Sequence, residues 1–228
     1  MFVKDKILFI MQTLSTSFNY LIFKNINEDK LISKFLNDSE NVFDIGSNVG
    51  SFIFKVSRKN KKKYLKFHSF EPNKEIGVNY KKILRSSNHI IFENNYGIGP
   101  HQGKAKFYKN SLSSQSTLKK DKTRLGETVD VHEIEINTID NYCKDNSINK
   151  IGLLKIDVEG TEIDVLMSAR NMLSKRNVNL IKIEIENQNI NEAFTILYGY
   201  GYELIGITNQ TYIKNKLKLA DFYFKIKI

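Results

Sequence analysis

Cysteine and proline are scarce in this sequence. The 228 residues include one cysteine, Cys143, and two prolines, Pro72 and Pro100. A single thiol cannot form an internal disulfide or a cysteine-based zinc site, so a disulfide-stabilised secreted scaffold and a structural zinc ribbon are excluded. The apolar share of 41% and the charged share of 26% are ordinary for a globular protein, which excludes a disordered, collagen-like or coiled-coil chain. The length fits one large α/β domain with short decorations.

A long uninterrupted apolar run is also missing. The stretch between Lys6 and Lys24 is uncharged, but polar residues interrupt it, and it is shorter than the about 20 apolar residues that a membrane-spanning helix needs. Its apolar residues recur at helical spacing, which predicts an amphipathic helix. That helix would pack on the domain, pair two copies of the chain, or lie on a membrane surface. We expect a cytoplasmic protein, with peripheral contact to the inner face of a membrane or a homodimer through this helix as alternatives.

The formal net charge of +10 raises the question of a nucleic-acid partner. Lysine is spread along the whole chain, and no basic stripe with interleaved aromatic residues stands out. The densest basic run, residues 58–63, falls where a predicted helix leads into a strand, which favours a solvated turn. We therefore expect no specific nucleic-acid partner.

Strand-like and helix-like segments alternate from residue 41 onward, with no linker rich in proline, glycine or serine. This alternation predicts a mainly parallel sheet with helices on both faces. The predicted strands are 41–45, 64–70, 89–92, 151–156, 180–185, 202–208 and 221–228, and the predicted helices are 29–36, 51–57, 73–84, 161–173 and 191–198. Residues 103–139 are predicted to form hairpin strands around a polar excursion. The resulting organisation is a helical extension over residues 1–38 and one domain over 39–228, with an insertion at about 100–136.

Acidic residues close several of the predicted strands. Asp44, Glu71 and Asp157 each stand at a strand end, and ligands of open parallel sheets bind beyond the carboxyl ends of the strands, where strand order reverses. Gly46 and Gly50 follow the first strand and let the backbone turn tightly and approach a ligand. Glu71 stands where an acidic side chain accepts hydrogen bonds from a ribose diol.

The glycine loop has the form Gly-x-x-x-Gly. It therefore departs from the Gly-x-Gly-x-x-Gly fingerprint of dinucleotide sites and lacks the Lys-Ser/Thr of a P-loop, which argues against an NAD-dependent oxidoreductase. A carboxylate just before the glycines disfavours a pyrophosphate. It suits a ligand with a cationic amino-acid end and a ribose, and S-adenosylmethionine fits that description.

Three sequence blocks carry a family resemblance: VFDIGSNVG at 42–50, FEPN at 70–73 and LKIDVEGTE at 154–162. In their order and spacing, over about residues 40–208, the sequence resembles the FkbM-type family of class I methyltransferases. The resemblance implies a Rossmann-like sandwich with a seven-stranded, mainly parallel sheet and an antiparallel C-terminal strand. It also implies S-adenosylmethionine as methyl donor and, as acceptor, a hydroxyl of a glycan or related small natural product.

The resemblance also implies roles for individual residues. Those that match the donor-binding loop are Asp44, Gly46, Asn48 and Gly50. Glu71 matches the ribose ligand, and Asn95 or Tyr96, after the third strand, are candidates to border the adenine.

An acidic cluster follows the fourth strand. Lys155, Asp157 and Glu159 alternate along an extended segment and share one face, near Glu184 and Glu186 of the adjacent strand. One hypothesis is that Asp157 or Glu159 orients or deprotonates an acceptor hydroxyl, which is a poor nucleophile until a base removes its proton. The alternative is structural: Lys155 neutralises Glu184 or Glu186, while Glu159 and Glu162 favour the N-terminus of the next helix.

Two further hypotheses concern the same chemistry. His101, in the loop after the third strand, is the histidine placed to overlook the site and is an alternative catalytic base. Asp157, Glu159 and Glu184 offer hard oxygen ligands of the kind that Mg²⁺ binds. Cys143 is predicted to be a core residue of a helix.

Rival functions are a nucleic-acid or protein methyltransferase and a non-catalytic donor-binding module. Amino methylation of a flipped base usually uses a Pro-Pro-aromatic turn after the fourth strand, where this chain has residues 157–160, DVEG. The non-catalytic module stays open, because the acceptor pocket would be built from the variable region 96–135.

Overall fold

The computed structural model describes residues 26–38, 40–76, 80, 87–111, 116–118, 128–213 and 216–228. The predicted helix between residues 6 and 24 lies outside this range, as does most of the predicted helix at 73–84, of which the short 3₁₀ turn η1 (Lys74–Ile76) is described.

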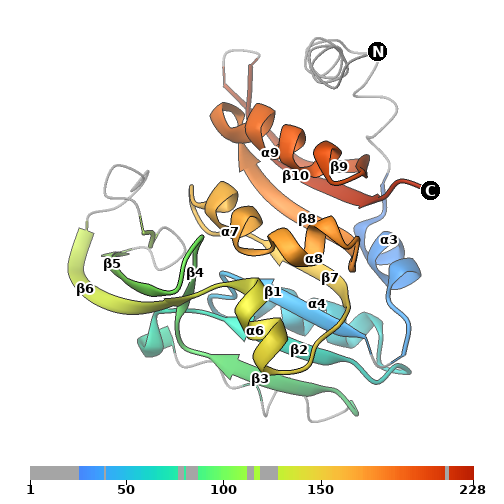
Figure 1. Cartoon of the computed structure of the whole chain (residues 1–228), viewed down its shortest axis with the longest axis horizontal. Coiled ribbons are helices and arrows are strands. Elements are labelled where there is room, and N and C mark those ends of the chain that lie inside the picture. Colours follow the sequence, from blue (N-terminus) through green and yellow to red (C-terminus); the bar gives the residue numbers. More distant parts are fainter. Residues whose placement is uncertain are drawn as a thin grey trace.

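The described residues form a seven-stranded sheet in the order β3-β2-β1-β7-β8-β10-β9 (Figure 1). Its strands are β1 (Asn41–Ile45), β2 (Lys66–Phe70), β3 (Ile90–Asn94), β7 (Ile151–Ile156), β8 (Val178–Glu186), β9 (Tyr202–Ile213) and β10 (Lys216–Ile226). Neighbours from β3 through β8 pair in parallel, whereas β10 is antiparallel to both β8 and β9. The predicted fold class is confirmed.

Strand order reverses between β1 and β7. The chain moves outward from β1 to β2 and β3, and then returns to place β7 on the other side of β1. The loops that leave β1 and β7 at their carboxyl ends therefore diverge, which opens a space above that edge of the sheet.

Helices cover both faces of the sheet (Figure 1). On one face, α3 (Glu28–Phe35) and α4 (Ser51–Lys59) bury apolar residues against alternate positions of the central strands. On the other face pack α6 (Ile139–Asp145), α7 (Glu162–Ser168), α8 (Arg170–Ser174) and α9 (Asn187–Gly199). None of the described helices is long and apolar enough to cross a bilayer.

Three predicted elements need correction. The predicted helix 161–173 is divided at Ala169, and the preceding Ser168 hydroxyl donates to the carbonyl of Val165 and accepts the Ile139 N–H, bonds that compete with a regular helix. Strands β9 and β10 begin or end well outside their predicted bounds, because they pair with each other along a long hairpin whose polar residues gave no strand signal.

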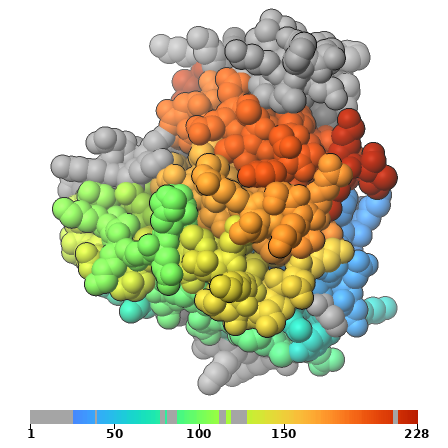
Figure 2. Space-filling view, in the orientation of Figure 1, coloured from blue at the N-terminus to red at the C-terminus, as the bar shows by residue number. Residues whose placement is uncertain are grey.

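A small second sheet, in the order β4-β6-β5, forms from the insertion. It consists of β4 (Gly97–Ile98), β5 (Gly103–Asn110) and β6 (Thr128–Asn137), with β5 and β6 paired antiparallel as the predicted hairpin. Phe107, Ile134 and Ile136 give it a core of its own. In the space-filling view, the green and yellow surface of this sheet lies beside the orange surface of the α7 region (Figure 2).

A buried ionic network attaches α3 to the sheet. The Glu28 carboxylate accepts hydrogen bonds from Lys182 Nζ and from the Tyr223 hydroxyl, both at 2.8 Å, and it also pairs with Lys55. Lys182 Nζ lies 2.9 Å from Asp221 Oδ2 as well. Burial alone would raise the pKa of Glu28, but the Lys182 charge and these hydrogen bonds outweigh it and lower the pKa to about 2. The start of the described chain is thus held by charge as well as by apolar packing.

We expect Glu28→Gln to destabilise the fold in a pH-dependent way. Because the folded-state pKa lies below the ordinary value of 4.5, the stabilisation is fully present above about pH 4.5 and is lost as pH falls through about 2. At pH 7 the free energy of unfolding should fall by up to roughly 3 kcal/mol. Chemical denaturation at several pH values measures this difference, which should shrink between pH 5 and pH 2.

A matched control is Glu75→Gln, because Glu75 forms an exposed ion pair with Lys109. Exposed pairs contribute about 0–1 kcal/mol, so this variant should differ little from wild type. A Glu28→Gln difference that stays constant down to pH 2 would contradict the assignment.

Candidate functional site

A cavity of about 300 Å³ lies where the strand order reverses. Its volume is at the lower end of the range of about 300–1,000 Å³ that small-molecule pockets occupy. The loops after β1, β2 and β7 form one side, and the insertion forms the other through Phe107 and residues 116–118. The two sides of the cavity therefore come from segments that are distant from each other in the sequence.

The loop after β1 is tightly wound. Gly46, Asn48 and Gly50 have φ angles of +75°, +44° and +74°, and Gly50 caps the N-terminus of α4. A Cβ on Gly46 would lie 1.9 Å from the carbonyl oxygen of Asp157, so no side chain fits there. Of the predicted donor-binding residues in this loop, Gly46 and Asn48 line the cavity, whereas Gly50 lies outside its described lining.

Glu71 lies in the cavity wall, held by two backbone groups. The N–H of Asn48 donates to Oε2 and the N–H of Asn73 donates to Oε1, both at 2.9 Å. Burial raises the pKa of Glu71, and the two N–H groups partly oppose this. A carboxylate has about four acceptor sites, so roughly two remain for the hydroxyls of a ligand.

Asp44 is fully buried and does not belong to the described lining of the cavity. Its Oδ1 lies 2.8 Å from Lys155 Nζ, which also donates to the Gly46 carbonyl at 2.8 Å and lies 3.4 Å from Asp157 Oδ2. Burial would lower the pKa of Lys155, but the Asp44 and Asp157 carboxylates outweigh it and raise the pKa. Lys155 therefore pairs with Asp44 and Asp157, and the alternative in which it neutralises a glutamate of β8 is wrong.

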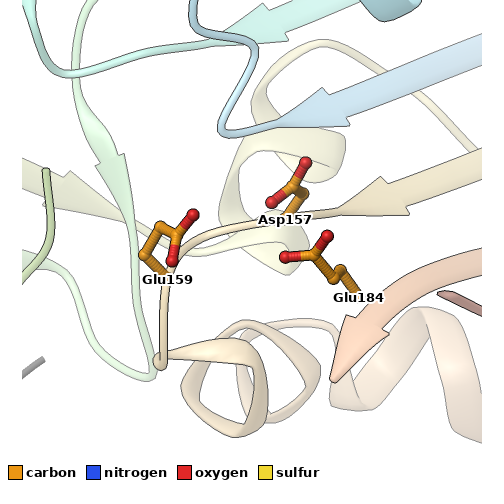
Figure 3. A group of neighbouring side chains, drawn as sticks. All are labelled: Asp157, Glu159 and Glu184. Carbon is orange, nitrogen blue, oxygen red and sulfur yellow. The ribbon is translucent and has the colours of Figure 1, made fainter. Parts of the chain in front are cut away.

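Three carboxylates meet at the carboxyl ends of β7 and β8. Asp157, Glu159 and Glu184 each offer an oxygen, and these oxygens lie within 4.8 Å of one another (Figure 3). All three side chains line the cavity. Such a group can accept hydrogen bonds from hydroxyls, accept a proton, or supply hard oxygen ligands to Mg²⁺.

The insertion is attached directly to the acidic turn. The Thr117 hydroxyl donates to the carbonyl oxygen of Glu159 at 2.8 Å, and Thr117 also pairs with Tyr108 of β5 through two backbone hydrogen bonds. The adjacent Leu118 lines the cavity. Sequence reasoning did not single out Thr117, because a polar excursion gives no signal of what it contacts.

The other predicted site residues differ in whether they line the cavity. Tyr96 lines the cavity, its hydroxyl donates to Asn94 Oδ1 at 3.3 Å, and burial raises its pKa to about 12. Asn95 and His101 are exposed, and neither belongs to the described lining. Cys143 is buried in α6, where burial raises the pKa of the thiol to about 12, as expected for an unreactive core residue.

The chain matches a known family model and is similar to several solved structures. The family model described as "Methyltransferase FkbM domain" matches residues 44–204. The structure is similar to a methyltransferase FkbM from Methylobacillus flagellatus, with a TM-score of 0.52 and 19% identity over 83% of this chain and 45% of that chain. The chain thus spans less than half the length of that protein. At this identity, the likeness shows a shared fold.

Two further solved structures match with lower scores. A precorrin-6y C5,15-methyltransferase from Geobacter metallireducens has a TM-score of 0.47 and 12% identity, over 89% of this chain and 90% of that chain. A ribosomal protein L11 methylase from Lactobacillus delbrueckii subsp. bulgaricus has a TM-score of 0.46 and 10% identity, over 88% of this chain and 77% of that chain. A comparison with curated proteins found no match.

We expect Gly46→Ala to destabilise the protein by more than about 2 kcal/mol, because backbone strain adds to the overlap with the Asp157 carbonyl. Gly199→Ala is the matched control: Gly199 lies in α9, and nothing lies within 4 Å of a Cβ placed there. That variant should be neutral or slightly stabilising. Chemical denaturation compares the two, and equal stabilities would show that the loop after β1 adapts to a side chain.

Proposed function

From the match over residues 44–204, the chain belongs to the FkbM methyltransferase family, whose methyl donor is S-adenosylmethionine, and we propose that it methylates a hydroxyl of a glycan or related small natural product. The observation that carries this proposal is the division of the cavity into two acidic parts. Glu71 lies on the side of the loop after β1, and the carboxylates of Asp157, Glu159 and Glu184 lie on the side of β7 and β8.

The donor would occupy the side of Glu71. The acceptor sites that Glu71 has left suit the two hydroxyls of a ribose, and the turn at Gly46 lets the ligand approach the backbone. Tyr96, which lines the cavity, is better placed than the exposed Asn95 to border the adenine. The cationic sulfonium and amino groups of the donor would be favoured by the surrounding carboxylates.

The carboxylates that line the cavity support an acceptor that donates hydrogen bonds, such as a polyol, over a phosphate-rich nucleic acid. The described lining includes four acidic residues and no lysine, arginine or histidine, although the chain as a whole carries a net charge of +10. Sugar hydroxyls can donate hydrogen bonds to carboxylates, whereas ionised phosphate groups only accept hydrogen bonds. This contrast favours a glycan hydroxyl as acceptor.

The chemistry needs a base close to the acceptor oxygen. Bound S-adenosylmethionine supplies an electrophilic methyl group; as the oxygen–carbon bond forms, the carbon–sulfur bond breaks and the sulfur keeps that electron pair. Asp157 would accept the proton of the hydroxyl at its carboxylate, while Glu159 and Glu184 orient the acceptor. Placing the oxygen in line with the methyl carbon and the sulfur supplies most of the remaining acceleration.

A metal-assisted version of the same reaction uses the same residues. Asp157, Glu159 and Glu184 fit the oxygen chemistry of Mg²⁺, and their oxygens lie close enough together to share one ion. A bound ion would lower the pKa of the acceptor hydroxyl, and the carboxylates would then act as ligands rather than as a base.

We expect the protein to bind S-adenosylmethionine and S-adenosylhomocysteine, and Glu71→Ala to weaken both. A hydrogen bond to a charged group is worth about 1.5–3 kcal/mol, which is a loss of roughly 10- to 150-fold in affinity. Titration calorimetry measures this, with Glu75→Ala, an exposed glutamate four residues away, as the control. Unchanged affinity in Glu71→Ala would remove Glu71 from the donor site.

Asp157→Asn should lower turnover by about 10²–10⁴ while donor affinity changes little, because the amide keeps the shape but cannot accept the proton. Turnover is measured by mass spectrometry, as the gain of one methyl group by neutral sugars, amino sugars, uronic acids or RNA, and the same measurement identifies the acceptor. Glu159→Gln should lower turnover less than Asp157→Asn does. Full turnover in Asp157→Asn would reject the base assignment, and loss of activity on chelation with recovery on added Mg²⁺ would favour the metal-assisted version.

Donor binding without methylation of any acceptor in the panel would favour a non-catalytic donor-binding module. Methylation of RNA in preference to every sugar would overturn the glycan proposal.

A further inference from the structure

Lys155 is buried at the carboxyl end of β7, with 5% of its surface exposed. Its ammonium group lies 2.8 Å from the Asp44 carboxylate, 2.8 Å from the Gly46 carbonyl, 3.4 Å from the Asp157 carboxylate and 3.5 Å from the Ile45 carbonyl. Asp44 and Gly46 belong to the end of β1 and its loop, whereas Asp157 opens the turn after β7. One side chain therefore joins both sides of the point where strand order reverses.

The residue type suits this position. A lysine ammonium is a compact charge with three donors, so it can serve three oxygens that lie in different directions, whereas the planar fork of an arginine cannot. Gly46 and Asp157 both line the cavity, and Lys155 itself is outside the described lining. Lys155 would therefore act on a bound ligand through the lining residues that it contacts, which are Ile45, Gly46 and Asp157.

Fold stability gives no general reason for a buried lysine at this position. Burying an ion pair costs desolvation, and well-packed apolar residues often stabilise a fold as well or better. The adjacent strand provides a direct comparison, because Lys182 of β8 pairs in register with Lys155 and is also largely buried. Its partners, Glu28 and Asp221, lie outside the cavity lining.

We propose that Lys155 is a positioning residue of the donor site, which fixes the Gly46 turn and the Asp157 carboxylate relative to each other. The inference rests on the proposed function, because it takes the loop after β1 to hold the donor. Without the ammonium group, the Gly46 carbonyl loses a hydrogen bond and the buried Asp44 loses its counter-ion. The turn would then no longer hold the backbone in the shape that the donor contacts.

The test compares Lys155→Met with Lys182→Met by titration calorimetry with S-adenosylmethionine and S-adenosylhomocysteine. All measurements are made at a temperature at which circular dichroism shows every variant to be folded. Lys155→Met should bind both ligands about tenfold more weakly or worse, and Lys182→Met should bind them within about threefold of wild type. A merely structural lysine would lower the melting temperature and leave the affinity of the folded protein unchanged.

A second pair of variants covers the case in which a methionine variant does not fold. Lys155→Arg and Lys182→Arg keep the buried charge and change only its shape, and we expect weaker donor binding in Lys155→Arg alone. Near-wild-type affinity in the Lys155 variants, or an equal loss in the Lys182 variants, would overturn the inference. If the wild-type chain binds neither ligand, the proposed function fails, and this inference fails with it.

Discussion

The parallel pairing of β1 with β7 is the constraint on which the site depends. It places Asp44 in register with Lys155, so the two side chains emerge on the same face and meet beneath the diverging loops. The same pairing brings the Gly46 turn against Asp157, at a distance that excludes a side chain on Gly46. The positions of the sheet, the loop after β1 and the turn after β7 therefore depend on one another. A change in the register of β1 and β7 would break the contacts between them.

This pair belongs to a row of polar side chains that crosses the sheet. Strand register aligns Ser69, Asp44, Lys155, Lys182 and Tyr223, from β2 to β10. Each of the two lysines is neutralised by a separate pair of carboxylates, and the ring of Phe52 lies 6.0 Å from Lys155 Nζ and 5.6 Å from Lys182 Nζ. The row thus has two ionic centres: one supports the cavity, and the other holds α3.

The net charge of the chain and the charged residues that line the cavity have opposite signs. The chain carries ten more positive than negative charges, yet the described cavity lining is acidic. A net charge averages over the whole surface, whereas a ligand responds to the groups within a few ångströms of it, because exposed charges farther away are screened over about 8–10 Å. The excess of lysine therefore says little about what enters this cavity.

Local patterns in the sequence predicted the fold class and drew attention to the glycine loop and Glu71. Alternating strand and helix periods predicted the sheet, and the glycine loop and Glu71 are recognisable because each directly follows a predicted strand. Only the tertiary structure decided that Lys155 pairs with Asp44 and Asp157, that Thr117 holds the insertion against Glu159, and that Asn95 and His101 lie outside the described cavity lining. The physical reason is that strand register and insertion packing depend on contacts between segments far apart in the chain, and periodicity within a segment carries no information about which partner it will meet.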